Sequence, residues 1–199
     1  FIVILGGAKV NDKIGVIENL VKKCDKILIG GGMAFTFLKT QGIEIGKSLI
    51  DEESIDFCKK ILEQYPDKII LPIDTAVTNE YTNEEKYRVK DIKDIAAIEM
   101  GLDIGPKTEE LFEKNISDSK IVVWNGPLGV YEFTKYKKNT DKLLKYIVDN
   151  NIKTILGGGN TVIDILYNLV KETYNVKPTV SDDTDVIPVY KYTSSSMTI

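Results

Sequence analysis

Apolar residues along the chain form short runs that alternate with longer segments in which they recur at helical spacing. The short runs predict strands at residues 2–5, 26–29, 68–71, 120–124 and 152–156. The longer segments predict helices at residues 12–23, 33–41, roughly 51–64, 107–115, 138–149 and 160–172. Because strands alternate with helices, we expect a single α/β domain with a doubly wound, mostly parallel sheet and helices on both faces.

Other segments are less regular. Asp51 can cap the third predicted helix. A short strand is predicted at 76–78 and a polar turn or hairpin at 79–85, whereas residues 174–199 break the alternating pattern.

Three glycine clusters come directly after predicted strands. They are Gly6-Gly7, Gly30-Gly31-Gly32 and Gly157-Gly158-Gly159. In open parallel sheets, ligands bind at the carboxyl ends of the strands, where helix N-termini offer N–H groups to phosphate. Glycine also lets the backbone approach a ligand closely. The clusters therefore predict a phosphate or nucleotide site, although a tight strand-to-helix turn requires glycine even without a ligand.

Two lysines accompany the first cluster. If the helix begins near Lys9, then Lys9 and Lys13 lie on one face of its first turn and form an anion site. The alternative is that Lys13 is solvated and Lys9 only lies along the surface.

Two further loops are candidates for holding a flat ring. Residues 124–130 (WNGPLGV) follow a buried strand and form an apolar slot, and Glu132 could accept hydrogen bonds from ribose or could simply be solvated. Residues 100–106 (MGLDIGP) form a similar glycine loop before a helix. Residues 42–48 (GIEIGKS) are one residue short of a P-loop, so we interpret them as a helix C-cap and loop.

Composition narrows the chemistry. The net charge of -4 argues against a nucleic-acid role driven by overall charge, and no apolar run has membrane-spanning length. The chain has no histidine, so catalysis must rest on lysines, carboxylates, backbone dipoles or a bound metal. We expect Cys24 and Cys58 to be ordinary thiols in a reducing compartment.

Four segments together carry a family resemblance. Residues 5–13 (LGGAKVNDK), 29–38 (IGGGMAFTFL), 100–106 and 124–133 (WNGPLGVYEF) resemble the C-terminal, nucleotide-binding half of phosphoglycerate kinase, in order and at near-family spacing. The resemblance implies that residues 1–199 form this Rossmann-like, three-layer α/β/α domain, without the N-terminal phosphoglycerate-binding domain.

The implied reaction is glycolytic phosphoryl transfer between 1,3-bisphosphoglycerate and ADP, which gives 3-phosphoglycerate and ATP with magnesium. The partners would be an adenine nucleotide and, through the N-terminal domain, 3-phosphoglycerate. We expect a cytoplasmic monomer that binds neither nucleic acid nor membrane, or an organellar one if a targeting segment precedes Phe1. We also expect this chain alone to bind nucleotide without turnover.

The resemblance assigns roles to particular residues. Lys9 would hold the migrating phosphoryl group, and Lys13 the nucleotide phosphates. The implied nucleotide-binding residues are Gly7, Ala8, Lys13, Gly31, Gly32, Gly101, Leu102, Asn125, Pro127, Val130, Glu132, Gly158, Gly159, Asn160 and Thr161.

Two departures from the family pattern leave alternatives open. Asn160 stands where the family has a metal-binding aspartate, and it is a poorer ligand for magnesium. The family's last glycine turn is also missing from residues 176–190. The alternatives are a nucleotide-binding or regulatory module without transfer activity, and a scaffold that keeps only the fold.

Overall fold

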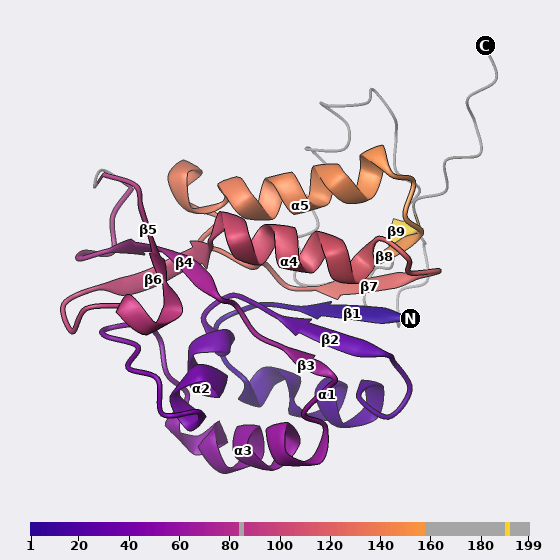
Figure 1. Cartoon of the computed structure of the whole chain (residues 1–199), viewed down its shortest axis with the longest axis horizontal. Coiled ribbons are helices and arrows are strands. Elements are labelled where there is room, and N and C mark those ends of the chain that lie inside the picture. Colours follow the sequence, from indigo (N-terminus) through magenta and orange to yellow (C-terminus); the bar gives the residue numbers. More distant parts are fainter. Residues whose placement is uncertain (84–85, 158–189, 192–199) are drawn as a thin grey trace.

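The computed structural model of the chain describes residues 1–83, 86–157 and 190–191, and its centre is a mostly parallel sheet (Figure 1). The strands of this sheet are β1 (Ile2–Leu5), β2 (Lys26–Ile29), β3 (Ile69–Ile70), β7 (Val122–Asn125), β8 (Thr154–Gly157) and β9 (Tyr190–Lys191). Their order is β3-β2-β1-β7-β8-β9, and only β9 runs antiparallel to its neighbour. The chain moves outward from β1 to β3 and then returns to β7, so the predicted doubly wound sheet is confirmed.

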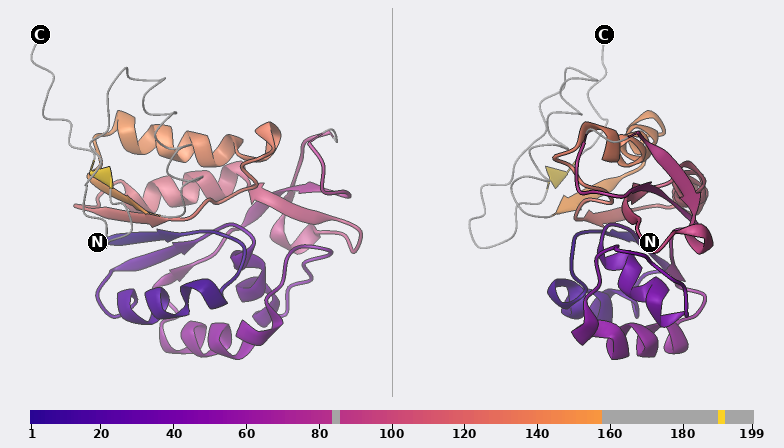
Figure 2. Two further views of the ribbon diagram at one scale, coloured as in Figure 1. Left: turned by 180° about the vertical axis from the view of Figure 1, so that it is seen from behind. Right: turned by 90° about the vertical axis from the view of Figure 1, so that its left-hand side faces the viewer.

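Helices cover both faces of this sheet (Figure 2). One face carries α1 (Ile14–Leu20), α2 (Met33–Thr40) and α3 (Ile55–Gln64), and the other carries α4 (Pro106–Ile116) and α5 (Lys138–Asp149). Short 3-10 turns are η1 (Asn11–Lys13), η2 (Glu52–Ser54), η3 (Ile92–Asp94) and η4 (Thr134–Tyr136). The predicted three-layer arrangement is therefore confirmed. No helix in the described ranges is both long enough and apolar enough to span a membrane.

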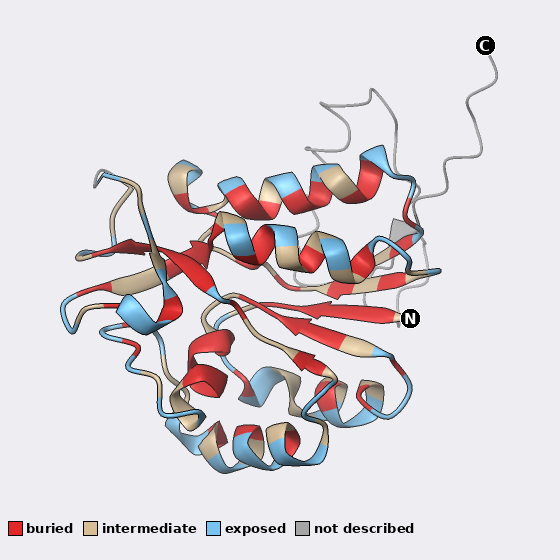
Figure 3. Cartoon of the chain, viewed as in Figure 1, coloured by how far each residue is buried: buried red, intermediate tan, exposed pale blue. Residues whose placement is uncertain are grey.

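The helices on both faces of the sheet explain the apolar runs of the sequence. In β1, Ile2 and Ile4 pack in the core under α4 and α5, whereas Val3 and Leu5 pack in the core over α1, α2 and α3. All four side chains are buried, as Figure 3 shows for the central strands. A strand that is buried on both faces has no polar positions, which is why these strands read as continuous hydrophobic runs.

A smaller antiparallel sheet extends from the main body, with the order β5-β4-β6. Its strands are β4 (Asp74–Thr78), β5 (Arg88–Asp91) and β6 (Met100–Ile104). The predicted strand at 76–78 is part of β4, but the predicted glycine loop at 100–106 is wrong, because residues 100–104 form β6. Gly101 does not mark a turn here; a side chain at this position would collide with the ring of Phe35, 2.2 Å from its Cβ.

Two details near the helix ends also differ from the predictions. The helix predicted at 12–23 is limited to η1 and α1, and Lys68 Nζ donates to the carbonyls of Val21 and Cys24 beyond its end, both at 2.9 Å. Asp51 does not cap α3, because its Oδ2 accepts from Asn11 N and Ser54 Oγ, both at 2.9 Å. The helix predicted at 160–172 lies outside the described residues.

Candidate functional site

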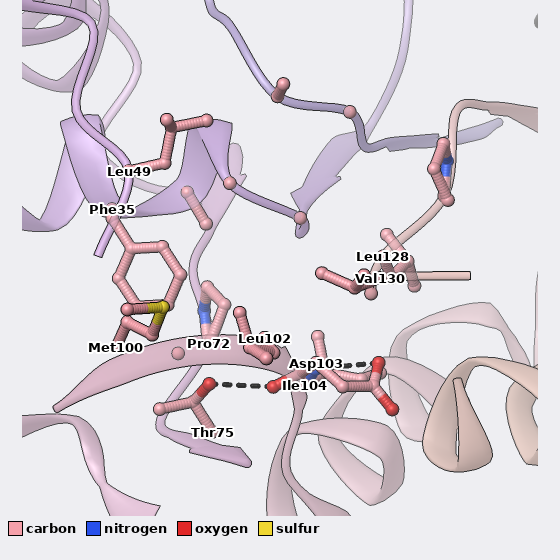
Figure 4. A pocket seen from close by; sticks show the side chains of 18 of the residues that line it. Phe35, Leu49, Pro72, Thr75, Met100, Leu102, Asp103, Ile104, Leu128 and Val130 are labelled. Carbon is pink, nitrogen blue, oxygen red and sulfur yellow. Dashed lines mark hydrogen bonds between the residues drawn. The ribbon is translucent and has the colours of Figure 1, made fainter. Parts of the chain in front are cut away.

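A cavity of about 400 Å³ lies between the carboxyl ends of the central strands and the small sheet (Figure 4). It is next to β1 and β7, where the strand order reverses and where open α/β sheets bind their ligands. Nine of the predicted nucleotide-binding residues line it: Gly7, Ala8, Gly31, Gly32, Gly101, Leu102, Pro127, Val130 and Glu132. The sequence therefore predicted the position of the cavity and much of its lining.

The glycine turns beside the cavity pack directly on one another. A Cβ on Gly6 would lie 2.0 Å from the carbonyl oxygen of Pro127, and one on Gly126 would lie 2.4 Å from the carbonyl oxygen of Gly6. Gly31 has a positive φ of +67°, and its Cβ would lie 2.7 Å from Gly7 N. Glycine is thus required here so that backbone can meet backbone, in addition to any need to approach a ligand.

Hydrogen bonds between these turns narrow one prediction. Gly7 N donates to Pro127 O at 2.9 Å, and Gly31 N donates to Leu128 O at 3.1 Å. Met33 N, at the start of α2, donates to Gly7 O at 3.0 Å. These three N–H groups are already paired within the chain, so they are not the ones that would bind phosphate, and phosphate binding at the helix N-termini stays a prediction. Gly7 remains distinctive, because its φ is +114° and no described atom lies within 4 Å of where its Cβ would be.

Apolar side chains form the two facing walls of the cavity. Figure 4 shows Phe35, Leu49 and Met100 on one side, and Leu128 and Val130 on the other. A cavity with apolar side chains on two facing sides suits a flat aromatic ring. Met100 lies in the 100–106 segment that was a candidate for holding a flat ring, whereas Phe35 and Leu49 were not predicted as binding residues, since an apolar residue in a helix or loop is more often part of the core.

The segment that carries Leu49 is held against the small sheet. Ser48 Oγ accepts from Gly101 N at 3.0 Å, and Lys47 N donates to Glu99 O at 2.7 Å. Gly42 and Gly46 have positive φ values, and Gly42 N donates to Lys39 O at the end of α2. The interpretation of residues 42–48 as a helix C-cap and loop is confirmed.

A buried ion cluster supports the same segment. The carboxylate of Glu99 is 3% exposed and lies 2.9 Å from Arg88 Nη1 and 2.8 Å from Lys90 Nζ. Burial by itself would raise the pKa of Glu99, but the Lys90 bond, the Ala96 N–H and the two cations bring it below its ordinary value. These ion pairs fix Glu99, whose carbonyl oxygen accepts from Lys47 N, to β5 of the small sheet.

The two candidate lysines have different surroundings. Lys9 is exposed in the turn after β1, and Lys13 lies in η1 with its Nζ 2.5 Å from Asn125 Oδ1. The prediction that both lie on one helical turn is wrong, because η1 begins at Asn11. Burial lowers the pKa of Lys13, and Asp12 opposes this shift. Lys9, Lys13 and Asn125 do not line the cavity, but the Lys13–Asn125 pair joins η1 to the end of β7.

The third glycine cluster is only partly described. A Cβ on Gly157, the last residue of β8, would lie 3.2 Å from Asn125 Nδ2, so the cluster begins beside the Lys13–Asn125 pair. Gly158, Gly159, Asn160 and Thr161 lie outside the described residues. Within the described part of the chain, no group of three or more Asp, Glu, Cys or His side chains could hold a metal. Asn160 as a metal ligand therefore stays a prediction.

Comparison with known proteins identifies the family. A sequence model described as phosphoglycerate kinase matches residues 1–175. The chain belongs to the phosphoglycerate kinase family. It is 52% identical to the phosphoglycerate kinase of Macrococcus caseolyticus over 162 residues, which are 81% of this chain and 41% of that protein. It is 53% identical to the phosphoglycerate kinase of Staphylococcus carnosus over 157 residues, which are 78% of this chain and 40% of that protein.

Solved phosphoglycerate kinase structures share the fold. The enzyme from Coxiella burnetii superimposes with a TM-score of 0.80 at 35% identity, over 86% of this chain and 45% of that one. The phosphoglycerate kinase from Pyrococcus horikoshii gives a TM-score of 0.72 at 26% identity, over 88% of this chain and 44% of that one. The chain thus matches less than half the length of each of these relatives.

Proposed function

We propose that this chain is the nucleotide-binding domain of a phosphoglycerate kinase, which transfers a phosphoryl group between 1,3-bisphosphoglycerate and ADP to give 3-phosphoglycerate and ATP. The observation that carries the proposal is the apolar cavity at the strand-order reversal, whose lining includes nine residues that the family resemblance assigned to the nucleotide. We assign 3-phosphoglycerate to the N-terminal domain that the resemblance implies. The relatives compared above are named as phosphoglycerate kinases, which gives no support to a regulatory module or a scaffold.

The cavity suits the base and ribose of the nucleotide. Adenine would lie between the wall of Phe35 and Leu49 and the wall of Val130, with Leu102 between them. Burial of the ring in an apolar slot is favourable, by roughly 25 cal/mol for each Å² removed from water. The exposed carboxylate of Glu132 at the cavity can accept hydrogen bonds from ribose hydroxyls.

Lysines would meet the phosphate end. Phosphoryl transfer needs positioning and charge neutralisation more than covalent help from the protein. The partly desolvated ammonium of Lys13 would gain an anionic partner, which would raise its lowered pKa again. Lys9 is exposed and carries no competing ion pair among the described residues, so its flexible side chain can follow the moving phosphoryl group.

Magnesium would neutralise charge on the nucleotide phosphates when it is bound. Asn160 would be its neighbour in this chain, and a neutral amide oxygen is a weaker ligand for this ion than a carboxylate. We therefore expect magnesium to strengthen nucleotide binding less here than in relatives that have aspartate at this position. We also infer a cytoplasmic monomer, in keeping with a glycolytic role.

The proposal is tested by calorimetric titration of the 199-residue chain with ADP and magnesium. Lys13→Ala removes a charge-assisted contact to phosphate and should weaken ADP binding about tenfold, and the loss of its bond to Asn125 should lower the unfolding free energy by about 1 kcal/mol. Lys23→Ala, a change of an exposed lysine after α1, should leave the affinity as it was. If the unaltered chain does not bind ADP, or Lys13→Ala matches Lys23→Ala, the proposal is wrong.

A coupled enzyme assay tests whether turnover with 3-phosphoglycerate requires a separate domain. The chain alone should bind ADP or ATP without phosphoglycerate-dependent turnover, since its cavity accounts for the nucleotide only. Substantial ATP turnover with 3-phosphoglycerate by this chain would contradict the assignment of the acid to a separate domain.

A further inference from the structure

A buried carboxylate, Asp103, belongs to the lining of the proposed base slot. Asp103 lies in β6, next to Leu102, and is 3% exposed. Its Oδ1 accepts from Ile104 N and from Thr140 Oγ1, both at 2.9 Å, and its Oδ2 accepts from Asn139 N at 3.1 Å. In the described ranges no lysine or arginine forms an ion pair with it. Burying a carboxyl group without a cation is costly, and these three hydrogen bonds are what offsets its loss of contact with water.

Those contacts join the slot to the start of α5. Asn139 and Thr140 lie in the first turn of α5, and Asn139 Nδ2 also donates to Ile104 O at 2.8 Å. The first turn of the helix is thus fixed to the end of β6 by bonds from backbone, amide and hydroxyl groups. The segment between β7 and α5, which carries the second wall of the cavity, must span from this anchor back to the main sheet.

The same carboxylate also sets how closely that segment approaches β6. A Cβ on Gly129 would lie 2.4 Å from Asp103 Oδ1, so the backbone of the segment packs directly on the carboxyl group. One residue later, Val130 N donates to Leu102 O at 2.8 Å. Leu102 and Val130 line the cavity from β6 and from the segment after β7. The Val130–Leu102 hydrogen bond and the packing of Gly129 on Asp103 hold these two segments together.

We propose that Asp103 is a positioning residue for nucleotide binding: by anchoring the first turn of α5 and the backbone at Gly129 to β6, it fixes Val130, which forms one wall of the slot, relative to Leu102, which lies between the walls. The inference rests on the proposed function, because it takes the cavity to be the site of the nucleotide base. Although Asp103 belongs to the cavity lining, it is 3% exposed and its carboxylate is engaged by β6 and α5, so we infer that it acts on the nucleotide through Leu102 and Val130.

The electrostatic surroundings make this anchor sensitive to pH. Burial raises the pKa of Asp103 to about 8, although the bonds from Thr140, Asn139 and Ile104 N oppose the shift. The titratable groups that face it are Asp141 in α5, Tyr131 in the segment after β7, and Tyr87 before β5. None of these groups is a cation, and Asp141 is accompanied by Lys137 at 3.7 Å.

The sign of the pH effect follows from this shift. The folded protein retains the proton of Asp103 between the ordinary aspartate pKa and about 8, so this group stabilises the fold at low pH and loses that contribution as the pH rises through 8. The hydroxyl of Thr140 can donate to a carboxylate or accept from a carboxylic acid, so the anchor is made in either state. Above pH 8 the carboxylate is ionised while buried without a cation, and we expect the desolvation penalty, which outweighs the three hydrogen bonds, to loosen the packing of α5 and Gly129 on β6.

The first test removes one hydrogen bond of the anchor without removing side-chain bulk. Thr140→Val keeps the volume and the branched shape of the side chain but cannot bond to Asp103, and it should weaken the binding of magnesium-ADP at pH 7 about fivefold. The matched control is Thr154→Val in β8, a buried threonine whose hydroxyl donates to Ile152 O away from the cavity. It should lower stability in urea without a change in affinity, whereas a purely structural Thr140 would behave in the same way as Thr154.

The second test uses the pH profile. The affinity of the unaltered chain for magnesium-ADP should fall between pH 7 and pH 9, and that of Asp103→Asn, which cannot ionise, should be the same at both. If Thr140→Val binds as tightly as Thr154→Val and the two pH profiles are parallel, Asp103 does not position the slot. If the unaltered chain binds no ADP at pH 7, the proposed function itself fails, and the inference fails with it.

Discussion

The two sides of the cavity are built in different ways. On the side of the main sheet, the turns after β1, β2 and β7 meet backbone to backbone and pair their own N–H groups with carbonyls. On the side of the small sheet, the cavity is bounded by side chains such as Phe35, Leu49 and Met100. On the first side a Cβ on Gly6 or Gly126 would clash with backbone, whereas on the second side apolar side chains form the wall.

This difference fits the two ends of a nucleotide. A phosphate group needs fixed dipoles and cations at defined places, and tightly packed turns keep such groups from moving. A base needs apolar area, which many side-chain combinations can supply. We therefore expect substitutions on the glycine side to act mainly on folding, and substitutions on the side-chain wall to act mainly on binding.

The largest effect is expected for a methyl group on the glycine side. In Gly6→Ala the new Cβ would lie 2.0 Å from Pro127 O, a backbone atom that can move only with its whole turn. We expect a loss of about 3 kcal/mol or more in unfolding free energy, measured by urea denaturation followed through the fluorescence of Trp124.

Gly15→Ala is the matched control for this substitution. Gly15 lies in α1, and no atom is within 4 Å of where its Cβ would be, so alanine should stabilise the chain by up to about 1 kcal/mol. A small effect of Gly6→Ala would show that the turns can separate, and the contrast between the two sides of the cavity would then disappear.

A smaller effect, with a pH signature, is expected for the support of the side-chain wall. Glu99→Gln keeps the shape of the side chain but removes the charge that pairs with Arg88 and Lys90. Both cations are about one-third exposed, so water screens the pairs, and we expect a loss of roughly 1–2 kcal/mol at pH 7.

The pH dependence of this loss identifies its cause. The pKa of Glu99 is lowered in the folded chain, so its contribution is present above the ordinary glutamate pKa and is lost as the pH falls through the lowered value. The two proteins should therefore converge in stability in acid, in urea titrations at pH 7, 5, 4 and 3. A difference that persists at pH 3 would point to lost packing instead of lost charge.

The sequence predicted the main sheet well because both of its faces are covered, so each central strand is a continuous apolar run. It predicted the small sheet poorly for the opposite reason. In β5 exposed and half-buried residues alternate, with the charged Arg88 and Lys90 half-buried. In β6, Gly101 and Asp103 are residue types that suggest a loop. They fit in a strand because of residues distant in the sequence: the ring of Phe35 lies beside Gly101, and Thr140 bonds to Asp103.

The same contrast between local and distant contacts explains which parts of the candidate site could be predicted. The glycine turns were predictable because their signal is local: an apolar run followed directly by glycine. Their mutual hydrogen bonds were not, since nothing in the turn after β1 indicates that Pro127 O will accept from Gly7 N. Phe35 and Leu49 in the apolar wall were missed because a leucine such as Leu49 has the same appearance in sequence whether it faces the core or a ligand.

The smallest effect is expected for Leu49, and it separates binding from folding on the side-chain wall. Leu49 lines the cavity yet is 46% exposed, so it can gain much of its burial only when a ligand covers it. Leu49→Ala should weaken ADP binding about fivefold, equivalent to about 1 kcal/mol, through the lost apolar contact. Its unfolding free energy should change by less than about 0.5 kcal/mol. Ile98→Ala is the control, because Ile98 is 58% exposed and does not line the cavity, and it should leave the affinity unchanged. Equal affinities for the two variants in calorimetric titration would place the base somewhere other than against Leu49.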